Sequence, residues 1–357
     1  MVTCRELVDE LFRIAVTLIS WVYAAGMALH LALRLAVGDQ PGGLLAAVNA
    51  IAPYLFLPLV LLIPLGVITR AKWGLLTTLP LAVVAAAWLG PRYLDKAEVV
   101  PSGPTLRLVT FNVYLRNQDL AGVERWLNAQ EADLVLLQEI PQNSILPLLY
   151  RQSARYPHQH TRFSLGRFAG NVVLSRHPIL DWESLNDPAE RSPYLMDRYW
   201  VEIGGRPVAV YNLDMPVPVD WSRASGGASI FQIIGLMSAY DDRLRNARID
   251  RFLERLSAET GPVIAAGDFN LSDYAVKYDA IFARLNDAYR MVGAGIGATW
   301  PADARENTLP DQLPPLLRLD YVWHSDHFRA VEAAVGPALG SDHRPVLVAL
   351  EPVGEPS

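Results

Sequence analysis

The sequence predicts an α/β domain preceded by an α-helical transmembrane region. Two observations lead to this prediction. The first part of the chain contains three long apolar runs that carry no Asp, Glu, Lys or Arg. From Leu106 onward, segments rich in β-branched residues alternate with segments of helical spacing, as in α/β folds. The 357 residues are enough for both parts, and 51% of them are hydrophobic, which is high for a purely soluble protein.

The three apolar runs have the length and setting of membrane helices. A spanning helix needs about 20 mostly apolar residues. Two of the runs are long enough and the third is at the short end of the range, with Trp73 and Trp88 near its ends, as interfacial aromatic residues are placed. We expect transmembrane helices at about residues 14–36, 43–69 and 73–90 within a membrane region of residues 1–92.

Two alternatives explain the apolar runs less well. A buried helical core would need a polar face to cover it, and residues 1–100 offer almost none. A cleaved signal peptide fits poorly because the start of the chain is acidic as well as basic, and because three apolar runs follow instead of one.

The positive charges beside the three runs predict an orientation. Four fall on the N-terminal side of a three-span arrangement (Arg5, Arg13, Arg70 and Lys72) and three on the other side (Arg34, Arg92 and Lys96). The positive-inside rule then places the N-terminus in the cytoplasm, by a margin of one charge. We therefore expect an integral protein of a bacterial plasma (inner) membrane with its C-terminal domain on the extracytoplasmic face.

Residues 93–105 read as a short linker because they are polar and contain proline and glycine. Strands are expected at "LRLVTFNV", "DLVLLQEI", "NVVLS", "YWVEI", "PVAVYNL", "PVIAAGDF", "LDYVWH" and "PVLVAL". Helices are expected at "LAGVERWLNAQEA", from about 242 to 258, and shortly after Ser272.

Polar side chains stand where these strands end or begin. They are Asn112, Glu139, Asp214, Asp268, Asn270, Asp320, Asp342 and His343. One such residue is typical of an ordinary turn. Loops at strand ends bring distant side chains together in α/β sheets, so the repetition of this pattern predicts a shared site at one sheet edge.

The residue types indicate the chemistry of that site. Carboxylates and asparagines form an oxygen-rich site suited to Mg²⁺ or Mn²⁺. Cys4 is the only cysteine, which excludes a disulfide framework and a cysteine-rich zinc site. The net charge of −6 provides no basic excess for binding nucleic acid. A metal, a base and an imidazole oriented by a carboxylate are the parts needed to hydrolyse a phosphate ester.

The motifs "TFNV", "LLQEI", "GNVVLSRHPI", "AAGDFN", "RLDYVW" and "GSDHRPV" occur in this order. With them the chain resembles the endonuclease/exonuclease/phosphatase superfamily of metal-dependent phosphoesterases over Leu106–Leu350. The resemblance implies a four-layer α/β/β/α sandwich with two mixed sheets, in a catalytic domain of residues 106–352.

The resemblance also implies roles for the residues at the strand ends. Glu139 matches the main metal ligand, with Asn112 and Asp342 in the same metal site. Asp268 matches the aspartate that orients or deprotonates the attacking water, and Asn270 the asparagine that holds the phosphate.

His343 matches the histidine that contacts the scissile phosphate, and Asp320 the aspartate that hydrogen-bonds this histidine. An imidazolium held by a carboxylate stabilises charge on phosphoryl oxygens.

Asp214 departs from the family pattern. The segment "YNLDMP" carries it where many members have a histidine that assists the leaving group. A carboxylate can do so only when protonated, which requires a raised pKa. Asp214 can instead hold a second cation, or the position is inactive, and Tyr211 is an alternative proton donor.

The segment after Asp214, "MPVPVDWSRASGGASIFQIIGLMSAY", has an unusual apolar content for a loop beside a site. Local packing over the domain core explains it slightly better than the alternative, a flap that faces lipid and admits a membrane-embedded substrate.

The sequence thus predicts a membrane-anchored, divalent-metal-dependent phosphoester hydrolase. Its substrate is expected to be a phospholipid, a lipid-linked phosphate or another small phosphate ester. A membrane-bound nuclease is an alternative that the acidic charge disfavours. A non-catalytic binding or scaffold protein that retains the fold is a further alternative, which Asp214 supports and the other site residues oppose.

Overall fold

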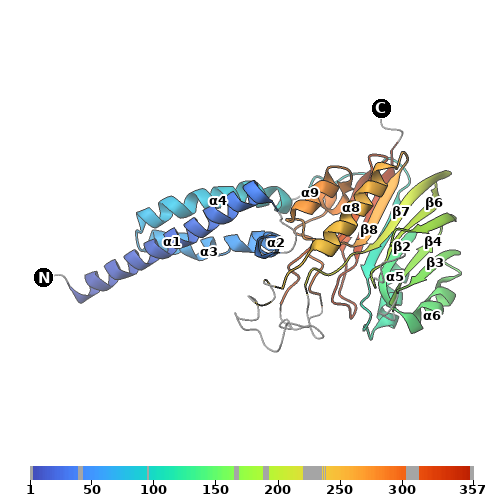
Figure 1. Cartoon of the computed structure of the whole chain (residues 1–357), viewed down its shortest axis with the longest axis horizontal. Coiled ribbons are helices and arrows are strands. Elements are labelled where there is room, and N and C mark those ends of the chain that lie inside the picture. Colours follow the sequence, from blue (N-terminus) through green and yellow to red (C-terminus); the bar gives the residue numbers. More distant parts are fainter. Residues whose placement is uncertain are drawn as a thin grey trace.

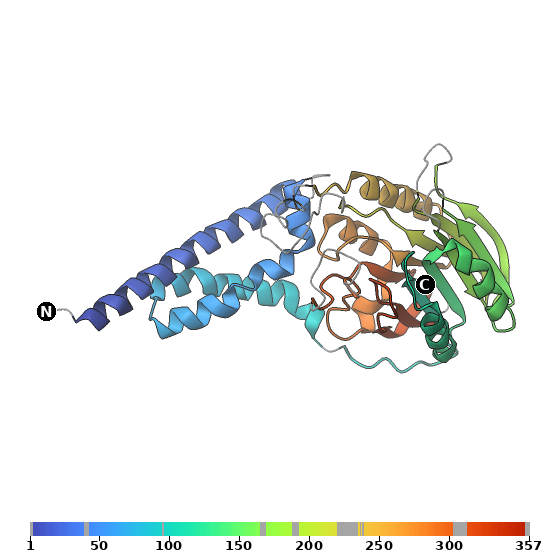
Figure 2. The same cartoon turned by 90° about the horizontal axis from the view of Figure 1, so that it is seen from below.

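The computed structural model describes residues 3–38, 43–94, 96–164, 169–187, 193–219, 235, 237, 239–302 and 313–353. Its N-terminal helices form an elongated bundle that projects from one side of a layered α/β domain (Figure 1). The turned view shows the same arrangement, with the N-terminus at the end of the bundle far from the domain (Figure 2).

Two helices of the bundle are long and apolar enough to cross a membrane, α1 (Cys4–Val37) and α4 (Lys72–Tyr93). They run side by side, since a Cβ added to Gly74 of α4 would lie 3.1 Å from the Ser20 hydroxyl of α1. The segment between them forms α2 (Leu44–Ala50), the 3₁₀ helix η1 (Ala52–Phe56) and α3 (Leu59–Ile68).

The expected single helix over residues 43–69 is wrong. Leu44–Ala50 and Ala52–Ile68 meet at a bend of 80°, so they form either one broken span or a re-entrant loop. Prolines explain the break, because Pro53 lies in the first turn of η1 and Pro58 directly before α3, and neither can donate a backbone hydrogen bond. The described residues therefore contain two candidate spans, or three if the bent pair counts as one.

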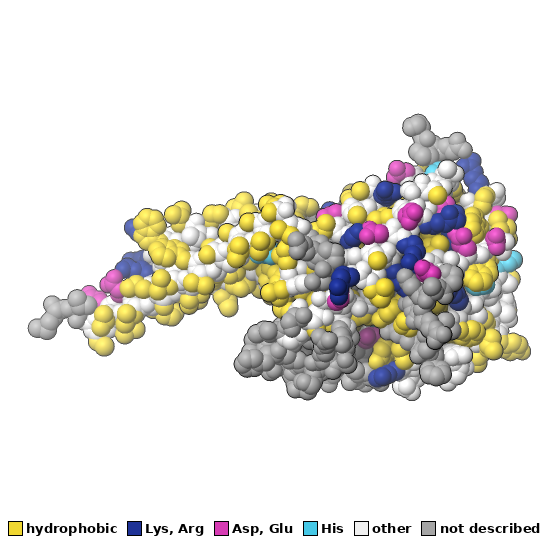
Figure 3. All heavy atoms as spheres, viewed as in Figure 1, with side chains coloured by type: hydrophobic (Ala, Val, Ile, Leu, Met, Phe, Trp, Pro, Cys, Tyr) yellow, Lys and Arg dark blue, Asp and Glu magenta, His cyan; other side chains and the backbone are white. Residues whose placement is uncertain are grey.

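The outer surface of the bundle is apolar. Figure 3 shows hydrophobic side chains along its length, whereas charged side chains gather on the α/β domain. Leu35 is 88% exposed and Val22 and Ile68 are each 76% exposed, and other large apolar residues of these helices are exposed to smaller extents. Such a continuous apolar surface is typical of helices that contact lipid.

The α/β domain contains two mixed sheets. The first has the strand order β11-β12-β1-β2-β4-β3, and the second β5-β6-β7-β8-β10-β9. Within them β1/β2 and β7/β8 are parallel and the other pairs are antiparallel. The strands are β1 (Leu106–Asn112), β2 (Leu134–Pro141), β3 (His158–Phe163), β4 (Ala169–Ser175), β5 (Ile179–Ser184), β6 (Met196–Ile203), β7 (Arg206–Asp214), β8 (Val263–Asp268), β9 (Asn286–Asp287), β10 (Asp320–His324), β11 (Phe328–Val335) and β12 (Val346–Pro352).

The sheets pack face to face and helices cover their outer faces, which confirms the four-layer sandwich. Leu108, Leu136, Val210 and Ile264 belong to the core that joins the two sheets. The described residues of the α/β domain form the helices α5 (Leu120–Gln130), α6 (Gln142–Gln152), α8 (Arg243–Ser257), α9 (Val276–Phe282) and α10 (Ala288–Val292).

Apolar spacing explains how the outer helices pack. In α8, Ile249, Phe252 and Leu256 recur at helical spacing and join the buried cluster on the outer face of the second sheet. In α5, Val123 and Leu127 do the same on the first sheet, and Asp119 caps the helix by accepting a hydrogen bond from the Gly122 amide at 2.8 Å.

Candidate active site

The sheet topology explains why the polar residues at the strand ends meet. Two parallel pairs, β1/β2 and β7/β8, place their carboxyl ends at one edge of the sandwich. β10 and β12 run antiparallel to β8 and β1, so their amino ends lie at the same edge. The candidate residues lie on these elements or in the adjacent loops, as the sequence predicts.

Asp268, Asp320 and His343 form a compact buried triad at this edge. Asp268 and Asp320 lie opposite each other in the β8/β10 register. His343 Nδ1 lies 2.8 Å from Asp320 Oδ2, and His343 Nε2 lies 3.6 Å from Asp268 Oδ2. The expected Asp320–His343 hydrogen bond is therefore present, and the imidazole bridges two carboxylates.

The electrostatics of the triad follow from burial and charge. Burial raises the pKa of Asp268, an effect that the neighbouring His343 opposes. Burial alone would lower the pKa of His343, but Asp320 and Asp268 together raise it well above its usual value. The arrangement thus favours a protonated imidazole beside an aspartate of weakened acidity.

Ligand atoms of these three residues lie within 4.8 Å of one another, so the triad itself can in principle hold a metal ion. A metal-binding histidine must be neutral at the coordinating nitrogen. The bridging position of His343 between two carboxylates favours its charged form instead. The geometry therefore fits a hydrogen-bonded triad better than a ligand set.

Glu139 and Asp342 fit a metal site better. Both line the cavity at the sheet edge together with Asn112. Burial and the nearby Glu139 raise the pKa of Asp342 to about 6, and its Oδ1 atom is buried without a hydrogen-bond partner within the described part of the chain. A divalent cation would relieve this repulsion and satisfy the carboxylate oxygens, which are ligands that Mg²⁺ prefers.

Asn112 and Asn270 orient Asp268 from two sides. The Asn112 side-chain amide donates to Asp268 Oδ2 at 3.0 Å, and that of Asn270 donates to the same oxygen at 3.1 Å. The Asn270 backbone amide donates to Asp268 Oδ1 at 2.8 Å. Asn112 thus contacts the predicted base directly, an interaction that the sequence does not reveal.

Asp214 ends β7 in register with Asp268 and is buried. It is not among the described residues that line the cavity, and its role stays a prediction. The suggestion that Tyr211 donates a proton to the leaving group is wrong. Its side chain lies in the core on the outer face of the second sheet, and its hydroxyl donates to Glu259.

Ser341 and Thr299 support the site, and the sequence analysis assigns them no role. The Ser341 hydroxyl donates to the Asn112 carbonyl at 2.8 Å and accepts from the His343 amide at 3.0 Å. The Thr299 hydroxyl accepts from the Leu319 and Asp320 amides. The motif "GSDHRPV" contains Ser341, so the signal for it was present.

A cavity of about 580 Å³ opens at this edge. Its wall includes Glu139, Asp268 and His343, and also Ala47 and Ala50 of α2. The volume is typical of sites for small molecules (~300–1,000 Å³). The sequence gives no sign that the membrane region reaches this site.

The apolar segment of residues 215–240 lies mostly outside the described residues, so the hypothesis of a lipid-facing flap is not tested. Its described ends contribute Val217, Pro218, Val219 and Met237 to the cavity wall.

Comparison with known proteins agrees with this fold. The sequence profile of the "Endonuclease/Exonuclease/phosphatase family" matches residues 109–343. A search of curated proteins finds no match.

Solved structures with the same fold include endonuclease/exonuclease/phosphatase proteins from three bacteria. The protein from Bacteroides vulgatus is 19% identical, with a TM-score of 0.52, over 70% of this chain and 100% of that one. The Leptotrichia buccalis protein is 19% identical, with a TM-score of 0.52, over 69% and 99%. The Beutenbergia cavernae protein is 20% identical, with a TM-score of 0.50, over 71% and 73%. Because the family profile covers well over half of the sequence and the fold agrees, the chain belongs to the endonuclease/exonuclease/phosphatase family.

Proposed function

We propose that the protein is a membrane-anchored, divalent-metal-dependent phosphoester hydrolase, with a catalytic domain of residues 106–352. The observation that carries this proposal is the Asp268–His343–Asp320 triad beside the carboxylates Glu139 and Asp342 in one cavity. Family membership supports phosphoester hydrolysis as the reaction class. The apolar helices α1 and α4 support a membrane anchor.

Mg²⁺ or Mn²⁺ would be held by Glu139, with Asn112 and Asp342 as further ligands. When bound, such an ion polarises a phosphoryl oxygen and neutralises charge that develops during hydrolysis. Oxygen ligands and the repulsion between Glu139 and Asp342 support this choice of cation.

The chain's own groups then have distinct tasks. Asp268, held by the amides of Asn112 and Asn270, is placed to orient a water molecule and accept its proton. A carboxylate of raised pKa is a better base than an ordinary aspartate, because its affinity for the proton is higher.

The protonated His343 faces the same cavity and can donate to a phosphoryl oxygen as negative charge accumulates there. Asp320 holds the ring in position and stabilises its charge. Asn270, which also lines the cavity, is proposed to bind the phosphate.

The function is tested by incubating the purified full-length protein with phosphodiesters and phosphomonoesters, with and without Mg²⁺. The panel includes a phospholipid, a lipid-linked phosphate, soluble esters and single-stranded DNA. Hydrolysis that requires the metal is the expected result. Preference for DNA would favour a nuclease, and a complete lack of turnover, with ligand binding retained, would favour a non-catalytic role.

A further inference from the structure

Part of the active-site cavity belongs to the membrane region. Ala47 and Ala50 of α2, and Ile51 directly after it, line the cavity that contains Glu139 and His343. The bend of 80° turns α2 away from the direction of the segment that follows it. In both views α2 lies at the end of the bundle next to the α/β domain (Figures 1 and 2).

Direct contacts hold this end of the bundle on the catalytic domain. The Tyr54 hydroxyl of η1 donates to the Leu316 carbonyl, one residue before Leu317 of the cavity wall. Trp88 of α4 packs edge-on against Tyr274, with ring centres 6.0 Å apart. Contacts made by η1 and by α4 therefore support the position of α2 beside the site.

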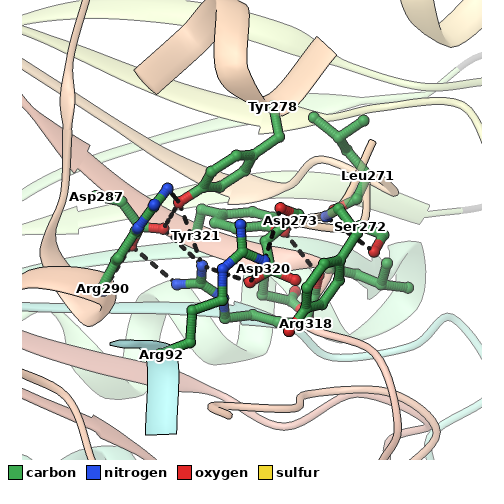
Figure 4. A network of polar contacts seen from close by, with 12 residues as sticks. Arg92, Leu271, Ser272, Asp273, Tyr278, Asp287, Arg290, Arg318, Asp320 and Tyr321 are labelled. Atoms are coloured by element: carbon green, nitrogen blue, oxygen red, sulfur yellow. Dashed lines mark hydrogen bonds and ion pairs between the residues drawn. The ribbon is translucent and has the colours of Figure 1, made fainter. Parts of the chain in front are cut away.

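A buried polar network adds to this attachment (Figure 4). Arg92, near the end of α4, lies 3.4 Å from Asp273 and stacks on Tyr274 at 4.2 Å. Asp273 also faces the buried Arg318, which lies 2.7 Å from Asp287. Because Arg318 precedes Asp320 by two positions, the network joins the anchor to the start of β10, which carries Asp320 of the triad.

The cavity wall combines two kinds of side chain. Carboxylates, asparagines and His343 line it, and so do the apolar residues Ala47, Ala50 and Ile51 of the helical bundle and Val217, Val219, Leu317 and Leu319 of the α/β domain. Among the described lining residues Arg116 is the one arginine or lysine. A wall with so few cations is poorly suited to a nucleic-acid backbone but suited to a hydrocarbon chain.

The apolar wall lies close to the lipid-facing surface. Leu44 at the start of α2 is 61% exposed, and Leu57 after η1 is 59% exposed. The segment of the chain that lines the cavity with Ala47 and Ala50 thus also presents exposed apolar side chains outward. A hydrocarbon chain held against the apolar wall of the cavity would therefore lie close to the apolar outer surface of the bundle.

We propose that Ala47, Ala50 and Ile51 form a subsite for the hydrocarbon chain of a lipid phosphate ester drawn from the bilayer. The phosphate would lie at the carboxylate end of the cavity, and the small alanine side chains leave room for the chain. This inference rests on the proposed hydrolase function and identifies the substrate class and the residues that select it.

The test compares two substrates with the same reacting group, p-nitrophenyl methyl phosphate and p-nitrophenyl hexadecyl phosphate. The full-length protein is assayed in phospholipid nanodiscs with Mg²⁺. We expect kcat/KM for the hexadecyl ester to exceed that for the methyl ester by at least about tenfold, since several buried methylenes contribute. Equal values would overturn the inference but leave the proposed function standing, and so would hydrolysis of neither ester by protein that is active on the panel described above. A lack of turnover on both esters and on that panel would contradict the function itself.

Variants then separate the subsite from simple enrichment of the hexadecyl ester in the membrane. Ala50→Trp fills the cavity and should lower the hexadecyl-to-methyl ratio at least about tenfold. Ala86→Trp, on an exposed position of α4, is the matched control and should keep the wild-type ratio. Because each ratio is measured within one variant, partial loss of folded protein cancels.

If Ala50→Trp hydrolyses neither ester, Ile51→Ser decides, because it removes apolar contact without adding bulk. A lowered ratio in Ile51→Ser supports the subsite. A wild-type ratio in whichever variant is active would show that the chain binds elsewhere and would overturn the assignment.

Discussion

The backbone of Glu139 is unusual for a residue within a strand. Its φ is +53°, in the left-handed region that non-glycine residues rarely adopt, and the β2/β4 pairing shifts between Leu137 and Ile140. Such local strain tends to be retained at functional sites, where the surrounding structure enforces it. The irregularity lies where β2 reaches the cavity, which explains how a residue inside a strand can serve the site.

Glu139→Gln removes the charge but keeps the shape of the side chain. We expect metal-dependent turnover to fall by at least about 100-fold and Mg²⁺ binding to weaken, because an amide is a poorer ligand than a carboxylate. Steady-state kinetics and Mg²⁺ titration measure both. Glu131→Gln is the matched control, since Glu131 also has a φ of +53° but is exposed. Normal turnover in Glu139→Gln would refute the metal-site assignment.

Asp320→Asn tests the charge on His343. Asp320 raises the pKa of His343, so the imidazolium persists to higher pH in the wild type. Loss of that carboxylate lowers this pKa, and the alkaline limb of the kcat profile should therefore shift to lower pH. Turnover should also fall by at least about tenfold. Asp326→Asn, in the turn after β10, should leave the profile unchanged, and an unshifted limb in Asp320→Asn would count against the pairing.

Asp214 tests the departure from the family pattern. It pairs with Asp268 in the β7/β8 register, and two substitutions distinguish a proton donor from a metal ligand at this position. If Asp214 donates a proton, Asp214→His should retain turnover but with a different pH optimum. Asp214→Ala should then lower turnover by about 100-fold. If it binds a cation, Asp214→His should lose turnover and require more Mg²⁺. Unchanged kinetics in Asp214→Ala would show that Asp214 has neither role and only ends its strand.

Among the elements, β8 shows how closely strands approach at the site. Gly267 has a φ of +140°, and a Cβ at this position would lie 1.9 Å from the Leu213 carbonyl oxygen of β7. Only glycine fits such a backbone. The close approach is next to Asp268 and helps to set its position beside β7.

Gly267→Ala should therefore destabilise the domain by more than about 2 kcal/mol, because both the backbone conformation and the contact become unfavourable. Thermal unfolding in detergent, followed by tryptophan fluorescence, measures the change in Tm. Gly261→Ala is the matched control, because its added Cβ would meet nothing within 4 Å. Equal Tm values for the two variants would contradict this account of β8.

The sequence predicts elements best where their pattern is regular. β1, β2, β4, β6, β7, β8, β10, β12 and helix α8 all lie where the periodicity or β-branched content places them. β3 and β5 escape prediction because they are polar strands at sheet edges, without a buried run. The break after Ala50 escapes prediction because hydropathy is insensitive to direction, and only the prolines signal it.

The candidate site follows the same rule. Residues at strand ends can be found from sequence because parallel topology gathers them. Contacts between distant parts, such as Asn112 with Asp268 or α2 with the cavity, depend on how separate elements pack, and no local pattern encodes that.

At the scale of the whole molecule, the bundle separates the N-terminus from the α/β domain. The C-terminal ends of α1 and α4 both point toward the α/β domain, and the segment between these helices runs back along the bundle, away from the domain (Figure 2). If the bundle spans the membrane, the N-terminus and the α/β domain must lie on opposite sides of the membrane.

The orientation predicted from charge then puts the catalytic domain outside the cytoplasm. A reporter active only after export, fused after Ser357, should be active in bacterial cells, and a cytoplasm-only reporter at the same position should be silent. As controls, the same reporters fused after Val37 and after Ile68 determine on which side of the membrane each end of the segment between α1 and α4 lies. The reverse pattern at Ser357 would overturn the orientation.

The pairing of β1 with β12 also bears on when the proposed activity can first arise during synthesis of the chain. Leu106 lies opposite Leu350, so the first strand of the domain waits for the last one to emerge from the ribosome. Asp342 and His343 come just before that last strand. A nascent chain stalled at Val335 lacks Asp342, His343 and β12 and should therefore be inactive. Activity of such a stalled chain would disprove this. The proposed hydrolysis would begin only after β12 has been synthesised, so shorter chains in the membrane would be inactive.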